Sequence, residues 1–221
     1  MDDYRAPTLT VDLVAFRVRE TQLEVLLLKR ANEPFRGEWA LPGGYNSAGE
    51  TTTEALSRVA KTKVGLDIDT DLGFFEQLVT VDTVARDPRG HAVSVVYVGC
   101  GYQFDLTSAS QVCRFWPVTA LPKTAFDHEK IIEYARSRLA SKLGYSNAVS
   151  GLLAKEFTLT QLQVAYEAVL GWALDKRNFR KKILSLGMIV ETGGRWAEGA
   201  HRPAKLYRFT SSNLQILPSL F

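Results

Sequence analysis

The sequence predicts two domains of different fold class: an α/β or α+β mixed-sheet sandwich, followed by a winged helix-turn-helix domain. The first part of the chain mixes alternating, β-branched segments with two helical ones. The second part has the order of three short helices and a hairpin. Basic residues are also concentrated in residues 175–208, which have a formal charge of +6, whereas the rest of the chain has −3. A basic module joined to a mildly acidic body favours a polyanion-binding domain.

Length and composition bound the class of protein. A chain of 221 residues allows one or two domains, and the change in composition predicts domains over residues 1–145 and 146–221. The apolar stretches at 25–28 and 93–98 are too short to span a bilayer. The acidic N-terminus does not have the pattern of a signal peptide, and two cysteines do not make a disulfide framework. We therefore expect a cytoplasmic, nucleoid-associated protein with no membrane contact.

The elements of the first domain follow from local pattern. Strands are predicted at residues 8–18, 23–29, 74–81, 92–101 and 111–117. Residues 32–44 are rich in proline and glycine and are expected to be irregular. A helix is predicted over 51–64 because Gly65 follows as a stop, and Asp127 is expected to cap a second helix that ends near Leu143.

The second domain is predicted in the same way. Ser146 is expected to cap a helix over 148–155. Thr158 precedes a helix over 159–170, and Asp175 caps one over 176–186. Strands at 188–191 and 204–209, with a turn at Gly193 and Gly194, complete the predicted wing.

Residues 44–66 resemble the Nudix box, whose pattern is G-x5-E-x7-R-E-U-x-E-E-x-G-U, where U is aliphatic. The matching residues are Gly44, Glu50, Arg58, Gly65 and Leu66, and the preceding WALPGG at residues 39–44 is also typical of the family. The resemblance covers about the first two-thirds of the chain and implies a Nudix domain.

The resemblance also shows what is missing. Nudix hydrolases bind divalent cations through carboxylates on one helical face, at the positions that Val59, Thr62 and Lys63 occupy here. An aliphatic side chain, a hydroxyl and a cation remove three negative charges from this face and add a positive one, so the face no longer suits Mg²⁺. We therefore expect no catalytic residue, no metal and no pyrophosphate hydrolysis. Glu50 is expected to compensate the helix dipole, and Arg58 to pair with Glu54.

A degenerate Nudix site is expected to bind a ligand without hydrolysing it. Phe35 and Trp39, with Phe75, are candidates for stacking on adenine, and core packing is the alternative. Arg86 and Arg89 are candidates for a diphosphate, and a solvated turn is the alternative. Glycines are expected to keep a special backbone conformation, and Lys63 to attract a phosphate. The predicted effector-binding residues are Phe35, Trp39, Gly43, Gly44, Lys63, Arg86 and Arg89.

The basic module has the pattern of a recognition helix and a wing. Phe179, Ile183 and Leu186 fall on one stripe of the helix and are expected to face the core. Outward arginine and asparagine suit major-groove recognition, while a solvated basic face is the alternative. Trp196 is expected to pack the wing. The predicted DNA-binding residues are Lys176, Arg177, Asn178, Arg180, Lys181, Lys182, Arg195, His201, Arg202 and Lys205.

The whole chain resembles the NrtR family, the Nudix-related transcriptional regulators of bacterial NAD metabolism. The stretches that indicate it, in order, are residues 39–44, 86–90, 125–128, 157–162, 174–179 and 199–208. The resemblance implies a homodimer that binds double-stranded DNA at a pseudo-palindromic operator, represses NAD synthesis or salvage genes, and releases DNA on binding ADP-ribose or a related small nucleotide, with no cofactor. Two alternatives stay open: an active ADP-ribose or nucleoside-diphosphate hydrolase with acids recruited from Glu50, Glu54 or Glu76, and a pentose-responsive regulator of sugar metabolism.

Overall fold

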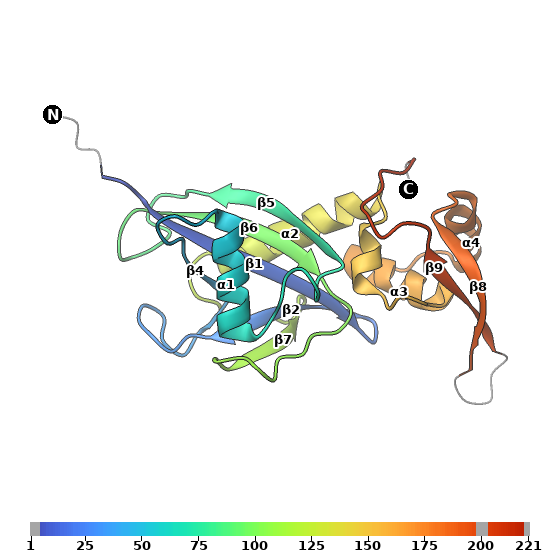
Figure 1. Cartoon of the computed structure of the whole chain (residues 1–221), viewed down its shortest axis with the longest axis horizontal. Coiled ribbons are helices and arrows are strands. Elements are labelled where there is room, and N and C mark those ends of the chain that lie inside the picture. The colour runs from blue at the N-terminus through green and yellow to red at the C-terminus, as the bar shows by residue number, and fades with distance from the viewer. Residues whose placement is uncertain (1–4, 198–202, 219–221) are drawn as a thin grey trace.

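A computed structural model of the chain describes residues 5–197 and 203–218. Its main feature is a seven-stranded mixed sheet with the path β3-β2-β1-β6-β5, in which β4 also pairs with β1, and β7 with β2 (Figure 1). The strands are β1 (Thr8–Arg19), β2 (Gln22–Lys29), β3 (Trp39–Ala40), β4 (Gly43–Tyr45), β5 (Phe74–Val81), β6 (Ala92–Cys100) and β7 (Cys113–Pro117). Only β1 and β6 pair in parallel among these strands. The predicted mixed sheet is therefore confirmed.

Helices cover both faces of this sheet. Alternate residues of β1 pack against α1 (Thr52–Val64) on one face and α2 (His128–Leu143) on the other. Leu13 belongs to the cluster with α1, and Phe16 to the cluster with α2. The α1 helix begins with a capping box between Thr51 and Glu54 and ends at Gly65 with φ 73°.

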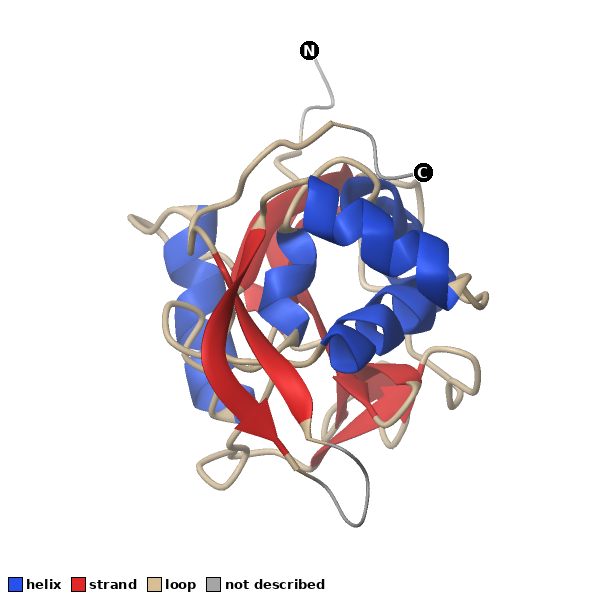
Figure 2. Ribbon diagram, turned by 90° about the vertical axis from the view of Figure 1, so that its right-hand side faces the viewer, coloured by secondary structure: helices blue, strands red, loops and turns tan. Residues whose placement is uncertain are grey.

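The C-terminal part has the order of a winged helix-turn-helix (Figure 2). Its elements are the 3₁₀ helix η1 (Ala148–Leu152), α3 (Leu159–Leu170), α4 (Lys176–Ser185), β8 (Ile189–Trp196) and β9 (Ala204–Phe209). Thr158 forms a capping box with Gln161, and the Asp175 carboxylate accepts from the Asn178 N–H, as expected of helix caps. This confirms the predicted fold class.

Three local predictions were wrong. The helix after Ser146 is a 3₁₀ turn that ends at Leu152 rather than residue 155; Asn147 holds its N-cap position without a side-chain cap, and the Ser146 hydroxyl accepts the Ala148 N–H at 3.3 Å. Residues 39–45 are not wholly irregular, because β3 and β4 pair with distant strands. Gly193 and Gly194 lie inside β8 at a bulge rather than at the turn, and Gly193 supplies a φ of 82° there.

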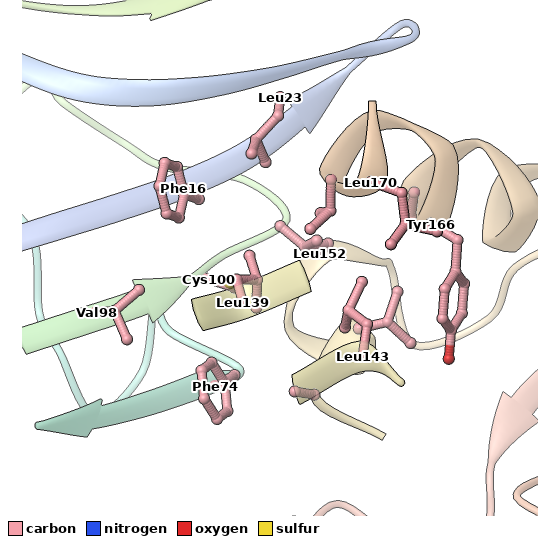
Figure 3. Close-up of a cluster of buried hydrophobic side chains, with 14 of the residues drawn as sticks. Phe16, Leu23, Phe74, Val98, Cys100, Leu139, Leu143, Leu152, Tyr166 and Leu170 are labelled. Carbon is pink, nitrogen blue, oxygen red and sulfur yellow. The ribbon is translucent and has the colours of Figure 1, made fainter. Parts of the chain in front are cut away.

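One hydrophobic cluster runs from the sheet into the C-terminal part (Figure 3). It includes Phe16 and Phe74 on strands, Leu143 at the end of α2, Leu152 on η1 and Tyr166 on α3. Figure 3 shows Leu143 and Leu152 between Phe16 and Phe74 on the strands and Tyr166 on α3. A displacement of α2 would therefore alter the packing of α3 directly. In the part of the chain that the structure describes, no helix has the length and apolarity needed to cross a membrane.

Candidate ligand pocket and DNA-binding surface

A pocket of about 410 Å³ lies where α1, β4 and the start of α2 meet the loops after β2 and β5. Cationic side chains dominate its charged lining: Arg30, Arg58, Lys63, Arg86 and Arg89. The acidic side chains of the lining are Asp12, Glu33 and Asp87. Such an excess of positive charge in a partly enclosed site favours an anionic ligand.

Five of the seven predicted effector residues line this pocket: Gly43, Gly44, Lys63, Arg86 and Arg89. The other two lie outside its lining. Phe35 packs against Phe126, with ring centroids 4.8 Å apart, and Trp39 packs against Trp116 at 5.3 Å. The aromatic side chains Tyr45 and Phe126 line the pocket instead, and the sequence prediction included neither of them.

Gly43 and Gly44 are required by close approach, not by backbone conformation as expected, since neither has a positive φ. A Cβ on Gly43 would lie 1.9 Å from Oδ1 of Asp12 and 2.8 Å from the Val11 carbonyl oxygen. A Cβ on Gly44 would lie 2.9 Å from Cγ2 of Val59. The glycines therefore let β4 lie directly against its neighbours and leave the pocket floor uncovered.

Arg86 is a buried partner in an ion pair, with a side chain that is 6% exposed. Its Nε and Nη2 donate to the two carboxylate oxygens of Asp127 at 3.0 and 2.8 Å, and Nη2 lies 3.9 Å from Asp12. The prediction that Asp127 caps α2 was wrong, because this carboxylate makes no cap hydrogen bond and binds Arg86 instead. Burial opposes the charged form of Asp127, but Arg86 outweighs it and lowers the pKa of Asp127.

Two further cations of the pocket are also paired. Arg89 contacts the Asp87 carboxylate at 2.6 Å and donates to Oη of Tyr45 at 2.8 Å. Arg58 donates from Nε to Glu50 at 3.0 Å, and this hydrogen bond lowers the pKa of Glu50 to about 2. The expected pair of Arg58 with Glu54 was wrong, because Glu54 closes the capping box.

Sequence reasoning missed Asp12 and did not connect it with His128. His128 is buried, its Nδ1 accepts the Leu41 N–H at 2.9 Å, and its Nε2 lies 3.8 Å from Asp12. Burial lowers the pKa of His128. Asp12 also accepts from the Ser94 hydroxyl. The position of Asp12 in an apolar strand was the one sequence signal for this cluster. Its partners Ser94 and His128 lie far away in the chain, so the sequence alone did not bring them together.

The helix face that carries carboxylates in Nudix hydrolases is only partly turned to the pocket. Val59 and Lys63 line it, but Thr62 is exposed and does not, so the three residues do not share one site as expected. Lys63 is half-buried, and its Nζ donates to the Gly43 carbonyl oxygen at 2.6 Å. Burial lowers the pKa of Lys63, with a smaller contribution from Arg30. Within residues 5–197 and 203–218, no three His, Cys, Asp or Glu side chains are grouped to hold a metal ion.

The acids considered for a recruited catalytic role are all engaged elsewhere. Glu50 pairs with Arg58, and Glu54 accepts from the Thr51 N–H and hydroxyl. Glu76 contacts Lys142 and lies 3.6 Å from Nε of Arg138, both on α2. These three glutamates do not line the pocket.

The outer face of α4 is a basic surface. Exposed along it are Lys176, Arg177, Asn178, Lys181 and Lys182. Its inner face confirms the predicted stripe: Phe179 and Ile183 are buried, and Leu186 is half-buried against the core. Arg180 differs from the other candidates, because it is half-buried and donates from Nη2 to the Thr160 hydroxyl at 3.2 Å.

The wing adds exposed cations next to α4. Arg195 and Lys205 face each other across β8 and β9, and Lys205 contacts Glu191 at 2.6 Å. His201 and Arg202 lie outside the described residues. The expectation that Trp196 packs the wing was wrong: it is 48% exposed, because it lies at the strand end opposite Ala204.

Comparison with known proteins accounts for both parts of the chain. Residues 7–135 match the Nudix domain, and residues 149–209 match the NrtR DNA-binding winged helix domain. The ADPR-responsive transcriptional repressor NtrR of Acinetobacter baylyi is 35% identical over 212 residues, covering 94% of this chain and 84% of that protein.

Two solved structures are also similar. Shewanella oneidensis NrtR complexed with a 27mer DNA has a TM-score of 0.79 and 35% identity, covering 91% of this chain and 93% of that one. The NUDIX domain of the same protein complexed with ADP ribose has a TM-score of 0.54 and 38% identity, covering 63% and 94%. Both the part of the chain with the pocket and the part with the basic helix are therefore similar to parts of a single protein, Shewanella oneidensis NrtR.

Proposed function

Because this chain belongs to the NrtR family of DNA-binding transcriptional regulators, we propose that it represses genes of NAD synthesis or salvage and releases its operator on binding ADP-ribose or a related nucleotide. The observation that carries the proposal is the presence, in one chain, of a cationic pocket and an exposed basic helix. The relatives named above, one ADPR-responsive and one crystallised with DNA, support the same pairing of functions.

The pocket is proposed to bind its nucleotide without hydrolysing it. The positions of the metal-binding acids are taken by Val59, Thr62 and Lys63, and the alternative acids are engaged in other contacts. Hard cations need several oxygen ligands with compensating charge. Incubation with ADP-ribose and Mg²⁺, followed by chromatography, tests this: ADP-ribose should remain intact, and steady AMP release would establish a hydrolase instead.

The α2 helix is proposed to connect the pocket with the DNA-binding part. Asp127, the residue before α2, is paired with Arg86 of the pocket lining. Some 24 Å further along the helix axis, Leu143 is buried in the cluster that also contains Tyr166 of α3. For a ligand to regulate DNA binding, it must have different affinities for the two arrangements of these parts.

The operator is proposed to be a pseudo-palindrome bound by a homodimer. A two-fold dimer presents two copies of α4, which suit half-sites separated by about one helical turn of DNA or a multiple of it. Arg177 and Asn178 lie exposed near the start of α4, where recognition helices contact base edges. In this arrangement, Lys176 and Lys182 are proposed to contact DNA phosphates.

A gel-shift titration on the intergenic region next to the gene tests the proposal. The protein should retard this DNA specifically at moderate salt, and ADP-ribose should release it at lower concentration than NAD or pentoses. The absence of specific retardation would refute the DNA-binding function. Release by a pentose but not by ADP-ribose would favour a regulator of sugar metabolism.

A further inference from the structure

The cations of the pocket are not equivalent, because most are already neutralised. Arg58 pairs with Glu50, Arg86 with Asp127, and Arg89 with Asp87. These guanidinium groups hold loops and helix ends together through charge-assisted hydrogen bonds. A ligand that used one of them would have to compete with a carboxylate that is already in place.

Arg30 and Lys63 are the exceptions. Arg30 donates from Nε to the Pro34 carbonyl oxygen at 2.8 Å and lies over the Phe126 ring, 4.7 Å from its centroid. Lys63 donates to the Gly43 carbonyl oxygen. Across the described parts of the chain, neither forms an ion pair with a carboxylate. The pocket therefore contains two positive charges with no carboxylate in direct contact, although Asp12 stabilises both charges at longer range.

The floor of the pocket leaves the Lys63 ammonium accessible. A Cβ on Gly44 would lie 3.7 Å from Nζ of Lys63. Because Gly44 has no side chain, nothing from that residue covers the amine. Burial lowers the pKa of Lys63, and the positive charge of Arg30 in the same pocket lowers it further. Two cations that line one pocket attract a doubly charged ligand more strongly than a singly charged one.

We propose that Arg30 and Lys63 form a metal-independent diphosphate subsite, in which the Lys63 ammonium supplies the positive charge that a divalent cation supplies in Nudix hydrolases. This inference rests on the proposed function of the same pocket. The diphosphate of a diester such as ADP-ribose carries two negative charges, which match the two cations that have no carboxylate in direct contact. A divalent cation is disfavoured there, because it would meet two positive side chains, while the nearby carboxylates of Asp12 and Asp87 already contact Arg86 and Arg89.

Titration calorimetry on the full chain tests this subsite, with ADP-ribose and inorganic pyrophosphate as probes and with EDTA or Mg²⁺ in the buffer. Affinity for ADP-ribose should be the same in both buffers. Lys63→Gln and Arg30→Gln should each weaken binding of ADP-ribose by about tenfold or more, as expected for a lost charge-assisted hydrogen bond. AMP, which lacks the diphosphate, should bind weakly and be less sensitive to Lys63→Gln.

Lys61→Gln is the matched control, because Lys61 lies on the same helix with a side chain that is 71% exposed and paired with Asp67. It should change the affinity by less than about twofold, since screened surface charges contribute little. Lys63→Arg keeps the charge and should retain more binding than Lys63→Gln. An unfolding midpoint for each variant separates lost binding from lost structure.

The outcomes distinguish this inference from the proposed function. If ADP-ribose releases DNA but binds only with Mg²⁺, or binds Lys63→Gln as tightly as the natural protein, the subsite is refuted while the effector stands. If pyrophosphate binds in EDTA and depends on Lys63 while ADP-ribose does not bind, the subsite stands and the effector is refuted. If no diphosphate binds, both are refuted.

Discussion

The guanidinium of Arg86 donates two parallel hydrogen bonds to the carboxylate of Asp127, at 3.0 and 2.8 Å, and so joins the loop between β5 and β6 to the start of α2. Asp12 lies 3.9 Å from the same guanidinium. This contact connects the wall of the ligand pocket with the helix whose far end packs against the DNA-binding part.

Replacing Arg86 should destabilise the protein strongly. Arg86→Ala leaves Asp127 and Asp12 without their buried cation, and the free energy of unfolding should fall by about 3 kcal/mol or more. Urea denaturation measures this. Arg89→Ala is the control: that side chain is 45% exposed, and its loss should cost less than about 1 kcal/mol. Equal losses for the two variants would contradict the structural role of Arg86.

Stability should depend on pH through His128. Burial lowers the pKa of His128 in the folded state, so the unfolded chain binds the proton more readily. The contribution of neutral His128 to the free energy of unfolding is complete above the usual histidine pKa of about 6.5. It is lost as the pH falls below that value. His128→Asn should flatten the dependence of unfolding free energy on pH between about 6.5 and 5. The exposed His91→Asn serves as control, and an unchanged slope in His128→Asn would refute the prediction.

Substitution of Arg177 should affect base preference. Arg177 is exposed in the first turn of α4, where a bidentate contact with guanine contributes about 1–3 kcal/mol of discrimination. Arg177→Ala should therefore lose affinity for the operator while binding to unrelated DNA changes little. Fluorescence anisotropy with operator and scrambled duplexes measures both. The exposed Lys155→Ala is the control, and equal loss on both duplexes would show that Arg177 contacts only the backbone.

Substitution of Lys182 should affect the salt dependence instead. This exposed lysine of α4 is expected to neutralise a phosphate, and each such contact contributes about one unit to the slope of log affinity against log salt. Lys182→Ala should reduce the slope by about one for operator and unrelated DNA alike. Lys61→Ala, on the pocket helix, should leave it unchanged. A slope for Lys182→Ala equal to that of the natural protein would exclude a phosphate contact.

Gly43 should not tolerate a side chain. In Gly43→Ala the new methyl group would lie 1.9 Å from Asp12 and 2.8 Å from the Val11 backbone, so the strand pair has to shift. Overpacking of this kind costs about 1–3 kcal/mol, and ligand affinity should fall with stability. Gly144→Ala is the control. Gly144 follows the last residue of α2 with a right-handed helical backbone conformation, so this substitution should cost less than about 1 kcal/mol of stability. Calorimetric unfolding and ligand titration of both variants make the comparison.

The elements that local chemistry specifies were predicted well. The caps at Thr158 and Asp175 and the stop at Gly65 fixed three helix ends, since side-chain and glycine signals act within a few residues. The buried stripe of Phe179 and Ile183 followed from helical spacing alone. Elements that depend on distant partners were missed, such as β3 and β4, which form only because β2 and β1 lie beside them.

The sequence by itself determined the two fold classes, the family and the basic helix, because each of these is a local pattern or a resemblance. Only the tertiary structure decided which cations of the pocket form an ion pair with a carboxylate and which do not. From the sequence, Arg86 and Arg89 were predicted to bind a diphosphate, but each forms an ion pair with a carboxylate. Arg30 and Lys63 form no such ion pair among the described residues. The physical reason is that an ion pair requires atoms a few ångströms apart in space, and Arg86 and Asp127 are 41 residues apart in the chain.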